Sequence, residues 1–303
     1  MICPYCKKGS HIIKTGKRRT SKGPVQKYRC MKCGRSFSDS AFPYSKYPLK
    51  LILHSMELYN MGYSATEIKG ILAKRYHRSP PATTIYSWTK RFKKDLTFIK
   101  IRNRVKPDPE RITKTKNFHH RQVFPFSYHI PKVNIHSKKF PGIKRYINWV
   151  ERSLPDRMFL EGPRMSTYKT SDSLKPKKIS NISPRLTQLA LERASHPNSP
   201  HTSVENFFLV NDSSTVATEI PVFLNPGEIK QVNIHVPITG HIDILQARFD
   251  HIYVMDYKPD LNHPENHSTQ LRLYGEAISK RMNIEKEKIS LMAFNEHSVF
   301  EYR

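Results

Sequence analysis

Two aspartates and a lysine in the C-terminal part of the chain have the types and spacing of a metal-dependent hydrolytic site. Asp243 ends the stretch GHID, and Asp256 and Lys258 lie in the stretch HIYVMDYK. Because side chains alternate along a strand, Asp256 and Lys258 point to one face and Tyr257 to the other. Two aspartates that meet from adjacent strands bind a hard ion such as Mg²⁺ or Mn²⁺, and a nearby ammonium stabilises negative charge in a transition state.

Four cysteines near the N-terminus have the spacing of a different metal site. Cys3 and Cys6 form one CxxC pattern, and Cys30 and Cys33 form a second. Four thiolates are the soft ligands that tetrahedral Zn²⁺ prefers, and Gly34 permits the turn after the second pair. The spacing predicts a structural zinc site; free or disulfide-linked cysteines are the alternative.

The cysteines need a small fold to position them. Tyr28, Phe37 and Ile12 are available to cover the site, and the basic stretch between the two pairs is typical of a hairpin with a Ser-Lys-Gly-Pro turn. A unit of about 40 residues has too small a core to fold alone, so zinc would supply much of its folding energy. The hairpin is interpreted either as a DNA contact or as a solvated loop.

Residues 48–94 carry the apolar spacing of three helices. The first is expected to end at Gly62, the second begins with the capping box Ser64–Glu67, and the third faces inward with Ile85, Trp88 and Phe92. The pattern predicts a helix-turn-helix DNA-binding domain, with a helical packing module as the alternative. The residues of the third helix expected to contact DNA are Thr83, Thr84, Ser87, Lys90 and Arg91, and Thr89 is also expected to face outward.

The first 95 residues resemble the N-terminal region of insertion-sequence transposases, in which a zinc ribbon precedes a helix-turn-helix. The resemblance lies in the pattern CPxC…YRCxxCGxxF, which runs here from Cys3 to Phe37. It implies a DNA-binding unit and does not import transposase chemistry.

Residues 97–180 are basic and rich in Pro and His without a sustained period, which predicts a basic connector of which part belongs to the following domain. Residues 142–154 have the spacing of a helix with one apolar face, and we expect this face to pack in the core of the following domain and not to stack on bases. The face comprises Ile143, Tyr146, Ile147, Val150 and Leu154. Four other histidines are interpreted as loop residues, namely His119, His120, His263 and His267.

Residues 181–303 alternate between helix and strand patterns. Helices are expected at 183–195 and 268–282, and strands at 214–224, 240–247, 251–258, 288–294 and 298–302. This predicts an α/β domain with a central mixed sheet. Gln270 and Tyr274 lie four residues apart on the second helix and share a face, so both can reach one cleft.

The stretches GHID, DYK and QLRLY, in this order, resemble the GxxD, DxK and QxxxY motifs of the PD-(D/E)XK nuclease superfamily, RecB-like branch. The resemblance covers roughly residues 185–303 and implies a restriction-endonuclease-like fold. It implies that Asp243, Asp256 and the Tyr257 carbonyl bind the metal and that Lys258 is catalytic. Gln270 and Tyr274 would orient that lysine or hold DNA.

The family also uses an acidic residue or a histidine upstream of these motifs. The sequence leaves four candidates open, namely Glu192, His196, His201 and Glu219. His241, two residues before Asp243, is interpreted as a polar strand residue near the cleft. No cysteine follows Cys33, which excludes the iron–sulfur cluster of CRISPR-linked relatives.

Charge points to a polyanionic partner. The chain has a net charge of +27, and its first 200 residues hold 43 basic against 11 acidic side chains. Such a segment attracts nucleic acid through counterion release. No apolar run approaches the roughly 18 residues of a membrane span, so we expect a cytoplasmic, DNA-associated protein without membrane contact.

The sequence thus predicts a multidomain protein: a zinc ribbon at 1–42, an all-α helix-turn-helix at 43–96, a basic connector at 97–180 and a nuclease-like α/β domain at 181–303. The expected function is DNA cleavage with structural Zn²⁺ and catalytic Mg²⁺ or Mn²⁺. A mobile-element or defence setting fits by analogy, and a homodimer is compatible. The alternatives are a non-cutting transcription regulator or scaffold with an inactive nuclease fold, and an RNA-processing enzyme.

Overall fold

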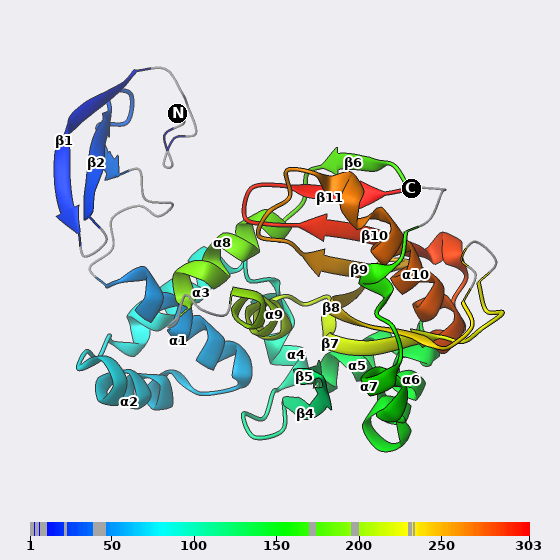
Figure 1. Cartoon of the computed structure of the whole chain (residues 1–303). Helices are drawn as coiled ribbons and strands as arrows, with labels where there is room; N and C mark the ends of the chain where they lie inside the picture. The colour runs from blue at the N-terminus through cyan, green and yellow to red at the C-terminus, as the bar shows by residue number, and fades with distance from the viewer. Residues whose placement is uncertain are drawn as a thin grey trace. The chain divides into compact units, whose positions relative to one another are not determined.

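The computed structural model divides into two compact units, Met1–Ile52 and Leu53–Arg303 (Figure 1). It describes residues 3, 6, 11–20, 23–38, 47–169, 174–194, 200–229, 232 and 234–303. In this described part of the chain, no helix has the length and apolar character needed to cross a membrane.

The first unit contains a three-stranded antiparallel sheet in the order β1-β2-β3. Its strands are β1 (Ile12–Thr20), β2 (Gly23–Cys30) and β3 (Ser36–Ser38). The register Thr20↔Gly23 confirms the hairpin, although its two tip residues, 21 and 22, lie outside the described residues. Gly34 has φ +69, the left-handed conformation that suits glycine at the expected turn.

Three helices follow where the apolar spacing predicts them. They are α1 (Leu49–Met61), α2 (Ala65–Tyr76) and α3 (Ala82–Phe92). The capping box is confirmed, because the Glu67 amide donates to Ser64 Oγ at 3.3 Å and the Ser64 amide donates to Glu67 Oε2 at 2.7 Å. Gly62 ends the first helix at φ +119, with the Pro107 carbonyl where a side chain would stand.

The second unit is built on an eight-stranded mixed sheet in the order β4-β5-β7-β8-β9-β10-β11-β6. All its pairs are antiparallel except β9 with β10, so the expected mixed sheet is confirmed. The strands are β4 (Thr113–His120), β5 (Gln122–His129), β6 (Pro176–Ile179), β7 (Thr215–Leu224), β8 (Ile238–Arg248), β9 (His251–Tyr257), β10 (Ile289–Phe294) and β11 (Val299–Tyr302).

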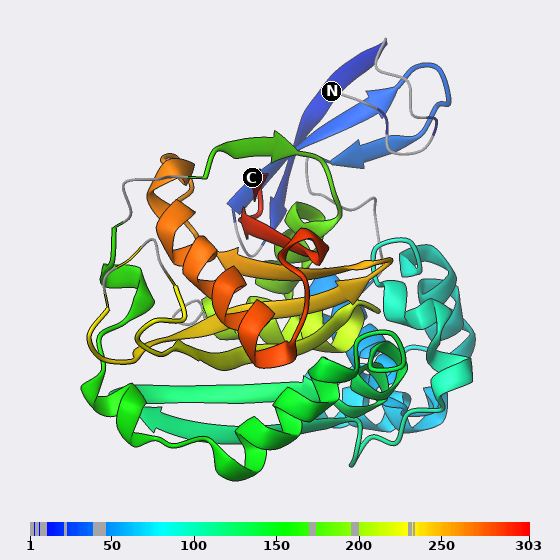
Figure 2. The same ribbon diagram turned by 90° about the vertical axis from the view of Figure 1, so that its right-hand side faces the viewer.

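Helices cover both faces of this sheet. Figures 1 and 2 show α8 and α9 on one side and α6 and α10 on the other. The helices of this part are α4 (Arg102–Val105), α5 (Ile130–His136), α6 (Pro141–Ser153), α7 (Arg157–Glu161), α8 (Ser183–Arg193), α9 (Pro200–Asn211) and α10 (Ser268–Met282). Short 3₁₀ turns connect them at η1 (Thr97–Lys100), η2 (Met165–Thr167), η3 (Pro264–His267) and η4 (Lys286–Lys288).

The segment expected to be a basic connector, 97–180, largely belongs to this folded unit. Its strands β4 and β5 extend the sheet, and β5 pairs with β7 through Ser127↔Thr218. The five apolar positions assigned to the core from 142–154 are all buried in it, as predicted. The loop interpretation of His119 and His120 is wrong, because both lie in β4.

The three helices and the sheet share contacts through α8 and α9. The Asn60 amide donates to Asn211 Oδ1 at 2.9 Å in a buried position, and Arg193 pairs with Glu57 at 2.5 Å. Lys132, which is fully buried, donates to the carbonyls of Leu209 and Asp212 at the C-terminal end of α9. Polar groups at these buried positions are therefore satisfied only when the helices and the sheet are assembled.

Candidate functional site

The four cysteines meet at one point in the first unit. Their sulfurs lie within 4.8 Å of one another, with Cys3 to Cys33 and Cys6 to Cys30 both at 3.6 Å. No disulfide links these four cysteines in the described chain, so the disulfide alternative is not observed. The rings of Tyr28 and Phe37 stack at 5.7 Å beside the buried Cys3 and Cys30, which confirms the expected cover. Four clustered soft donors are consistent with a structural zinc ion.

A second group of possible metal ligands lies across neighbouring strands of the large sheet. The pairs Thr218↔Ile244 and Ile220↔Ile242 place Glu219 of β7 opposite Asp243 of β8. The ladder Ile244↔Met255, continued by one residue, places Asp243 opposite Asp256 of β9. Three carboxylates therefore stand at the same level of three adjacent strands, where like charges repel unless a cation or proton neutralises them.

Glu219 interrupts the regular ladder at this point. Its φ is +49, a left-handed conformation that costs a non-glycine residue about 1–3 kcal/mol. On the next strand, the side chain of Asp243 accepts a backbone hydrogen bond: the Tyr257 amide donates to Asp243 Oδ2 at 2.7 Å. Such irregularities in the middle of a sheet re-aim side chains, and here both involve carboxylates of the same cluster.

Glu205, on α9, completes the cluster from the helical layer. Ligand oxygens of Glu205, Glu219 and Asp243 all lie within 4.8 Å of one another. Glu205 is 2% exposed, and its Oε1 has no hydrogen-bond partner among the described residues. Sequence reasoning missed this residue because α9 itself was not expected; the stretch PHTSVENFFLVN lacks a clear amphipathic period.

Asp256 lies beside this cluster and is held by Lys258. Asp256 is 1% exposed, its Oδ2 lies 2.7 Å from Lys258 Nζ, and its Oδ1 has no hydrogen-bond partner in the described chain. The ion pair confirms that Asp256 and Lys258 share one face. Tyr257 packs elsewhere, against Phe294 with ring centroids 5.7 Å apart.

The electrostatics of the cluster favour a bound cation. Burial raises the pKa of Glu219 to about 7, and burial together with neighbouring carboxylates raises the pKa of Glu205 and of Asp243 well above the usual value. Burial opposes the charge of Lys258, yet Asp256 and Asp243 raise its pKa above the usual value. The lysine is therefore an ammonium at neutral pH, and oxygen donors this close fit a hard divalent ion.

Gln270 and Tyr274 on α10 contact each other, as their spacing predicts. Gln270 Nε2 donates to Tyr274 Oη at 2.8 Å, and burial followed by the charges of Asp256 and Asp243 raises the pKa of Tyr274. A Cβ on Gly240 would lie 2.5 Å from Tyr274 Cε1, so only glycine lets the ring pack here. Both α10 residues thus stand within electrostatic reach of the aspartates.

The four candidates for the upstream metal ligand lie in different places. Glu219 is in the cluster, and Glu192 is not among the carboxylates that the described residues bring together. His201 Nε2 donates to the Tyr257 carbonyl at 3.0 Å, so it contacts the oxygen expected to bind metal. His196 lies outside the described residues.

His241 is part of a buried aromatic group. Its ring stacks on Phe124 with centroids 3.6 Å apart and planes 5° apart, and its Nε2 lies 2.9 Å from His120 Nδ1. Asp156 Oδ1 lies 3.1 Å from the other nitrogen of His120. His120 was expected in a loop; it is buried because Phe124 and Phe159 pack around it.

On α3, the expected DNA-facing residues are mostly accessible. Thr83, Ser87, Lys90 and Arg91 are exposed, and Thr84 is half-buried. Thr89 was expected to face outward but is 8% exposed, because its hydroxyl donates to the Tyr86 carbonyl. Tyr86 was missed: it is 50% exposed and lies three residues from Thr83, on the same face.

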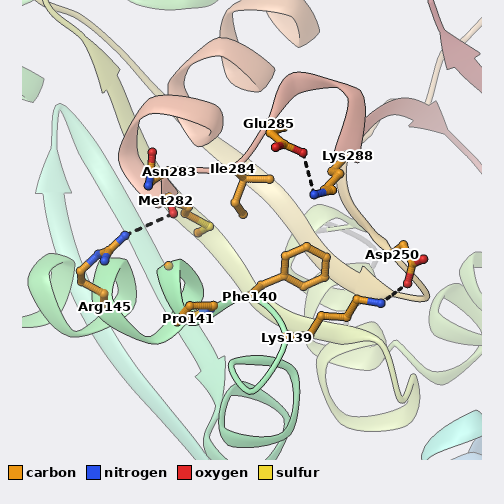
Figure 3. Close-up of a pocket in the computed structure, with 11 residues that line it drawn as sticks. Lys139, Phe140, Pro141, Arg145, Asp250, Met282, Asn283, Ile284, Glu285 and Lys288 are labelled. Atoms are coloured by element: carbon orange, nitrogen blue, oxygen red, sulfur yellow. Dashed lines mark hydrogen bonds and ion pairs between the residues drawn. The ribbon is translucent and has the colours of Figure 1, made fainter.

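A cavity of about 500 Å³ lies away from these groups, at the far end of α10 (Figure 3). Figure 3 shows the ion pairs Lys139–Asp250 and Lys288–Glu285 at its edge, so its charged side chains mostly neutralise one another. Gln270 and Met282 are separated by about 18 Å along the helix axis. The cavity is therefore separate from the carboxylate cluster.

No protein-family model matches the sequence, and no curated protein or solved structure matches it significantly.

Proposed function

We propose that the protein is a divalent-metal-dependent nuclease that hydrolyses DNA phosphodiester bonds. The observation that carries the proposal is the carboxylate cluster of Glu205, Glu219 and Asp243 beside the buried Asp256–Lys258 ion pair. The resemblance of GHID, DYK and QLRLY to the RecB-like branch of the PD-(D/E)XK superfamily agrees with this chemistry. The eight-stranded mixed sheet supports it at the level of fold class only.

The oxygen donors fit Mg²⁺ or Mn²⁺. Asp243, Glu219 and Glu205 would hold the ion, with the unpartnered Asp256 Oδ1 as a further donor. When bound, such an ion polarises a phosphoryl oxygen and makes a coordinated water more acidic. The chain supplies the rest: Lys258, held by Asp256, places a positive charge where negative charge develops, and Gln270 with Tyr274 lines the adjacent wall.

The N-terminal residues would bring DNA to this site. We propose that the cysteine cluster is a zinc ribbon and that α1 to α3 form a helix-turn-helix, as in the transposase N-terminal regions that the sequence resembles. The strong positive charge of residues 1–200 supports a polyanionic partner. On α3, Thr83, Tyr86, Ser87 and Lys90 form an exposed stripe that fits a groove-reading face.

The test is a cleavage assay with zinc retained. Purified protein is incubated with linear and circular DNA, single- and double-stranded, and with structured RNA, each with Mg²⁺ or Mn²⁺. We expect Asp256→Ala and Lys258→Ala to lower DNA cleavage by at least about 10²-fold while DNA binding persists. Asp260→Ala is the matched control, because Asp260 is exposed two residues beyond Lys258.

Other outcomes would redirect the assignment. Tight DNA binding without cleavage under any metal would support the transcription regulator or scaffold with an inactive nuclease fold. Cleavage of RNA in preference to DNA would support the RNA-processing enzyme. Cleavage that survives Asp256→Ala would place the active site elsewhere.

A further inference from the structure

We infer that Arg164, which no sequence motif singled out, is a phosphate-binding catalytic residue of this site. Its guanidinium would grip the phosphate that lies over the carboxylate cluster and stabilise the charge that develops there. The inference rests on the proposed nuclease function, and it names a residue that the sequence resemblance does not include.

The backbone of Arg164 is fixed to the strand that carries the metal ligands. Arg164 forms a parallel bridge with Thr239, and the Thr239 amide donates to the Pro163 carbonyl at 3.0 Å. Thr239 directly precedes Gly240, on which the ring of Tyr274 packs. The segment beginning at Arg164 therefore runs beside the start of β8, four residues before Asp243.

The residues ahead of Arg164 are packed tightly. Arg121 donates to the carbonyls of Leu160 at 2.9 Å and Gly162 at 3.2 Å. A Cβ on Gly162 would lie 2.5 Å from the Met158 carbonyl oxygen and 2.7 Å from that of Pro237, so only glycine fits between them. A residue on such a fixed segment loses little freedom when it binds a ligand.

The side chain of Arg164 extends along the same buried aromatic group as His241. Its guanidinium carbon lies 5.5 Å from the centroid of the Phe124 ring, which itself stacks on His241 at 3.6 Å. Arginine is weakly hydrated and stacks on aromatic faces while keeping its donors free for a ligand. The ring thus supports the guanidinium without using up its N–H groups.

The charge of Arg164 acts on groups from several elements of the site. After burial, it contributes to the pKa values of Glu219 on β7, of Lys258 after β9 and of Tyr274 on α10. These pKa influences agree with the position that the backbone bridge and the Phe124 ring define.

Arg164 is also a cation without a carboxylate partner among the described residues. Several other arginines of the described residues form ion pairs, among them Arg111, Arg157, Arg185, Arg193, Arg281 and Arg303. Lys258, the other cation of the site, is already engaged by Asp256.

A phosphate approaching four carboxylates meets strong repulsion. A metal ion offsets only part of it, and a guanidinium adds charge together with two parallel N–H donors that match phosphate oxygens. Arg164 is half-buried, so part of the residue is open to solvent and to such a ligand. This combination is the reason to assign the phosphate to Arg164 and not to Lys258 alone.

The experiment compares Arg164→Ala and Arg164→Lys with Arg157→Ala in the full-length, zinc-loaded protein. The Arg157→Ala control removes the same charge from an exposed position, and among the described residues Arg157 forms an ion pair with Glu161. With Mn²⁺ and saturating protein, we expect single-turnover DNA cleavage to fall about 100-fold in Arg164→Ala and about 10-fold in Arg164→Lys, because lysine keeps the charge but not the paired donors. Arg157→Ala should match the wild type within about twofold.

A second readout separates a phosphate contact from a structural role. Added guanidinium ion, at millimolar concentrations too low to unfold the protein, should restore part of the cleavage by Arg164→Ala and none of that by Asp256→Ala. Equal cleavage by Arg164→Ala and Arg157→Ala would overturn the inference while the nuclease stands. A loss in Arg164→Ala that guanidinium does not rescue, with Arg164→Lys equal to the wild type, would also overturn it.

A binding measurement keeps the inference testable without cleavage. The dinucleotide pTpT is titrated with Ca²⁺ present, since it is too short to report on extended DNA contacts. If the wild type cuts no DNA, the nuclease proposal fails, and pTpT binding at least about tenfold weaker in Arg164→Ala than in Arg157→Ala still supports the phosphate contact. Equal binding by the two variants, or no binding by the wild type, would overturn it.

Discussion

The two clusters of potential metal ligands differ in how the chain assembles them. The cysteines come as two pairs, each spanning four residues, within the first 33 residues. The carboxylates come from α9, β7, β8 and β9, separated by other elements of the fold. The first cluster is therefore visible in local spacing, whereas the second exists only after the sheet and α9 have come together.

The clusters also relate differently to folding. The first unit has a small buried core of Cys3, Tyr28, Cys30 and Phe37, so a metal ion bound by the cysteines would supply part of its stability. The carboxylates sit in a large core that folds around them and that raises their pKa values. We therefore expect the cysteine cluster to need an ion for its fold, and the carboxylate cluster to need an ion or protons to relieve repulsion in a fold already formed.

The largest expected effect is the response of the first unit to zinc removal. Cys30→Ser, or a strong zinc chelator, should unfold the β1–β3 sheet, because structural zinc contributes about 10 kcal/mol or more of apparent binding energy. The large sheet should stay folded. Amide hydrogen exchange measured per residue checks both, and Met31→Ser, at a 57% exposed position between the paired cysteines, is the control. If the β1 and β2 amides stayed protected from hydrogen exchange after zinc removal, the first unit would not depend on zinc for its fold.

The second prediction concerns pH. The raised pKa of Glu219, from 4.5 to about 7, means that the folded state holds more protons than the unfolded state between these values. The metal-free stability contributed by this group therefore falls as pH rises through that window, by up to about 3 kcal/mol. Glu219→Gln should remove the part of the fall that this group contributes, while Glu205 and Asp243 keep theirs, and it should be more stable than the wild type at pH 8 without metal. Denaturant unfolding at several pH values, with and without Mn²⁺, measures the free energy of unfolding of both proteins. The same pH dependence of that free energy in the wild type and in Glu219→Gln would refute the prediction.

The third prediction tests the contribution of α9. Glu205→Gln should weaken Mn²⁺ binding about 10- to 100-fold, because it removes one charged donor from a cluster with ligand atoms within 4.8 Å. Glu192→Gln, which changes a carboxylate outside that cluster, should leave the affinity unaltered. Isothermal titration calorimetry on both variants gives the answer, and equal affinities would remove Glu205 from the site.

The smallest expected effect concerns a local feature, the capping box of α2. Ser64→Ala removes the acceptor of the Glu67 amide and should lower the free energy of unfolding by about 1 kcal/mol. Thr66→Ala, exposed on the same helix, should change it by less than half as much. Urea denaturation compares the two. A loss for Ser64→Ala no larger than that for Thr66→Ala would show that the capping box does not stabilise α2.

Features contained within a few residues could be predicted from the sequence. The cysteine pairs, the Ser64–Glu67 cap and α10 at 268–282 each depend on neighbouring residues, and the structure has them where expected. The same holds for the alternation that sets Asp256 and Lys258 on one face. Catalytic roles for these residues stay predictions.

Features that depend on contacts between distant segments could not be predicted. Strands β4 and β5 carry lysines, histidines and Pro125, and only pairing with β7 makes them part of the sheet. Glu219 was one of four candidates because only the pairing of β7 with β8 and the packing of α9 bring it beside Asp243 and Glu205. Glu205 and Arg164 had no signal beyond their residue type.

The buried Asn60–Asn211 hydrogen bond and the Glu57–Arg193 ion pair join the three-helix segment directly to the helices on the sheet. A flexible tether would let a cutting site sample many positions along bound DNA. These contacts instead hold the three-helix segment at a fixed distance from the carboxylates. If α3 binds a DNA sequence and the carboxylates cut, the break should therefore fall at a constant number of base pairs from the bound sequence.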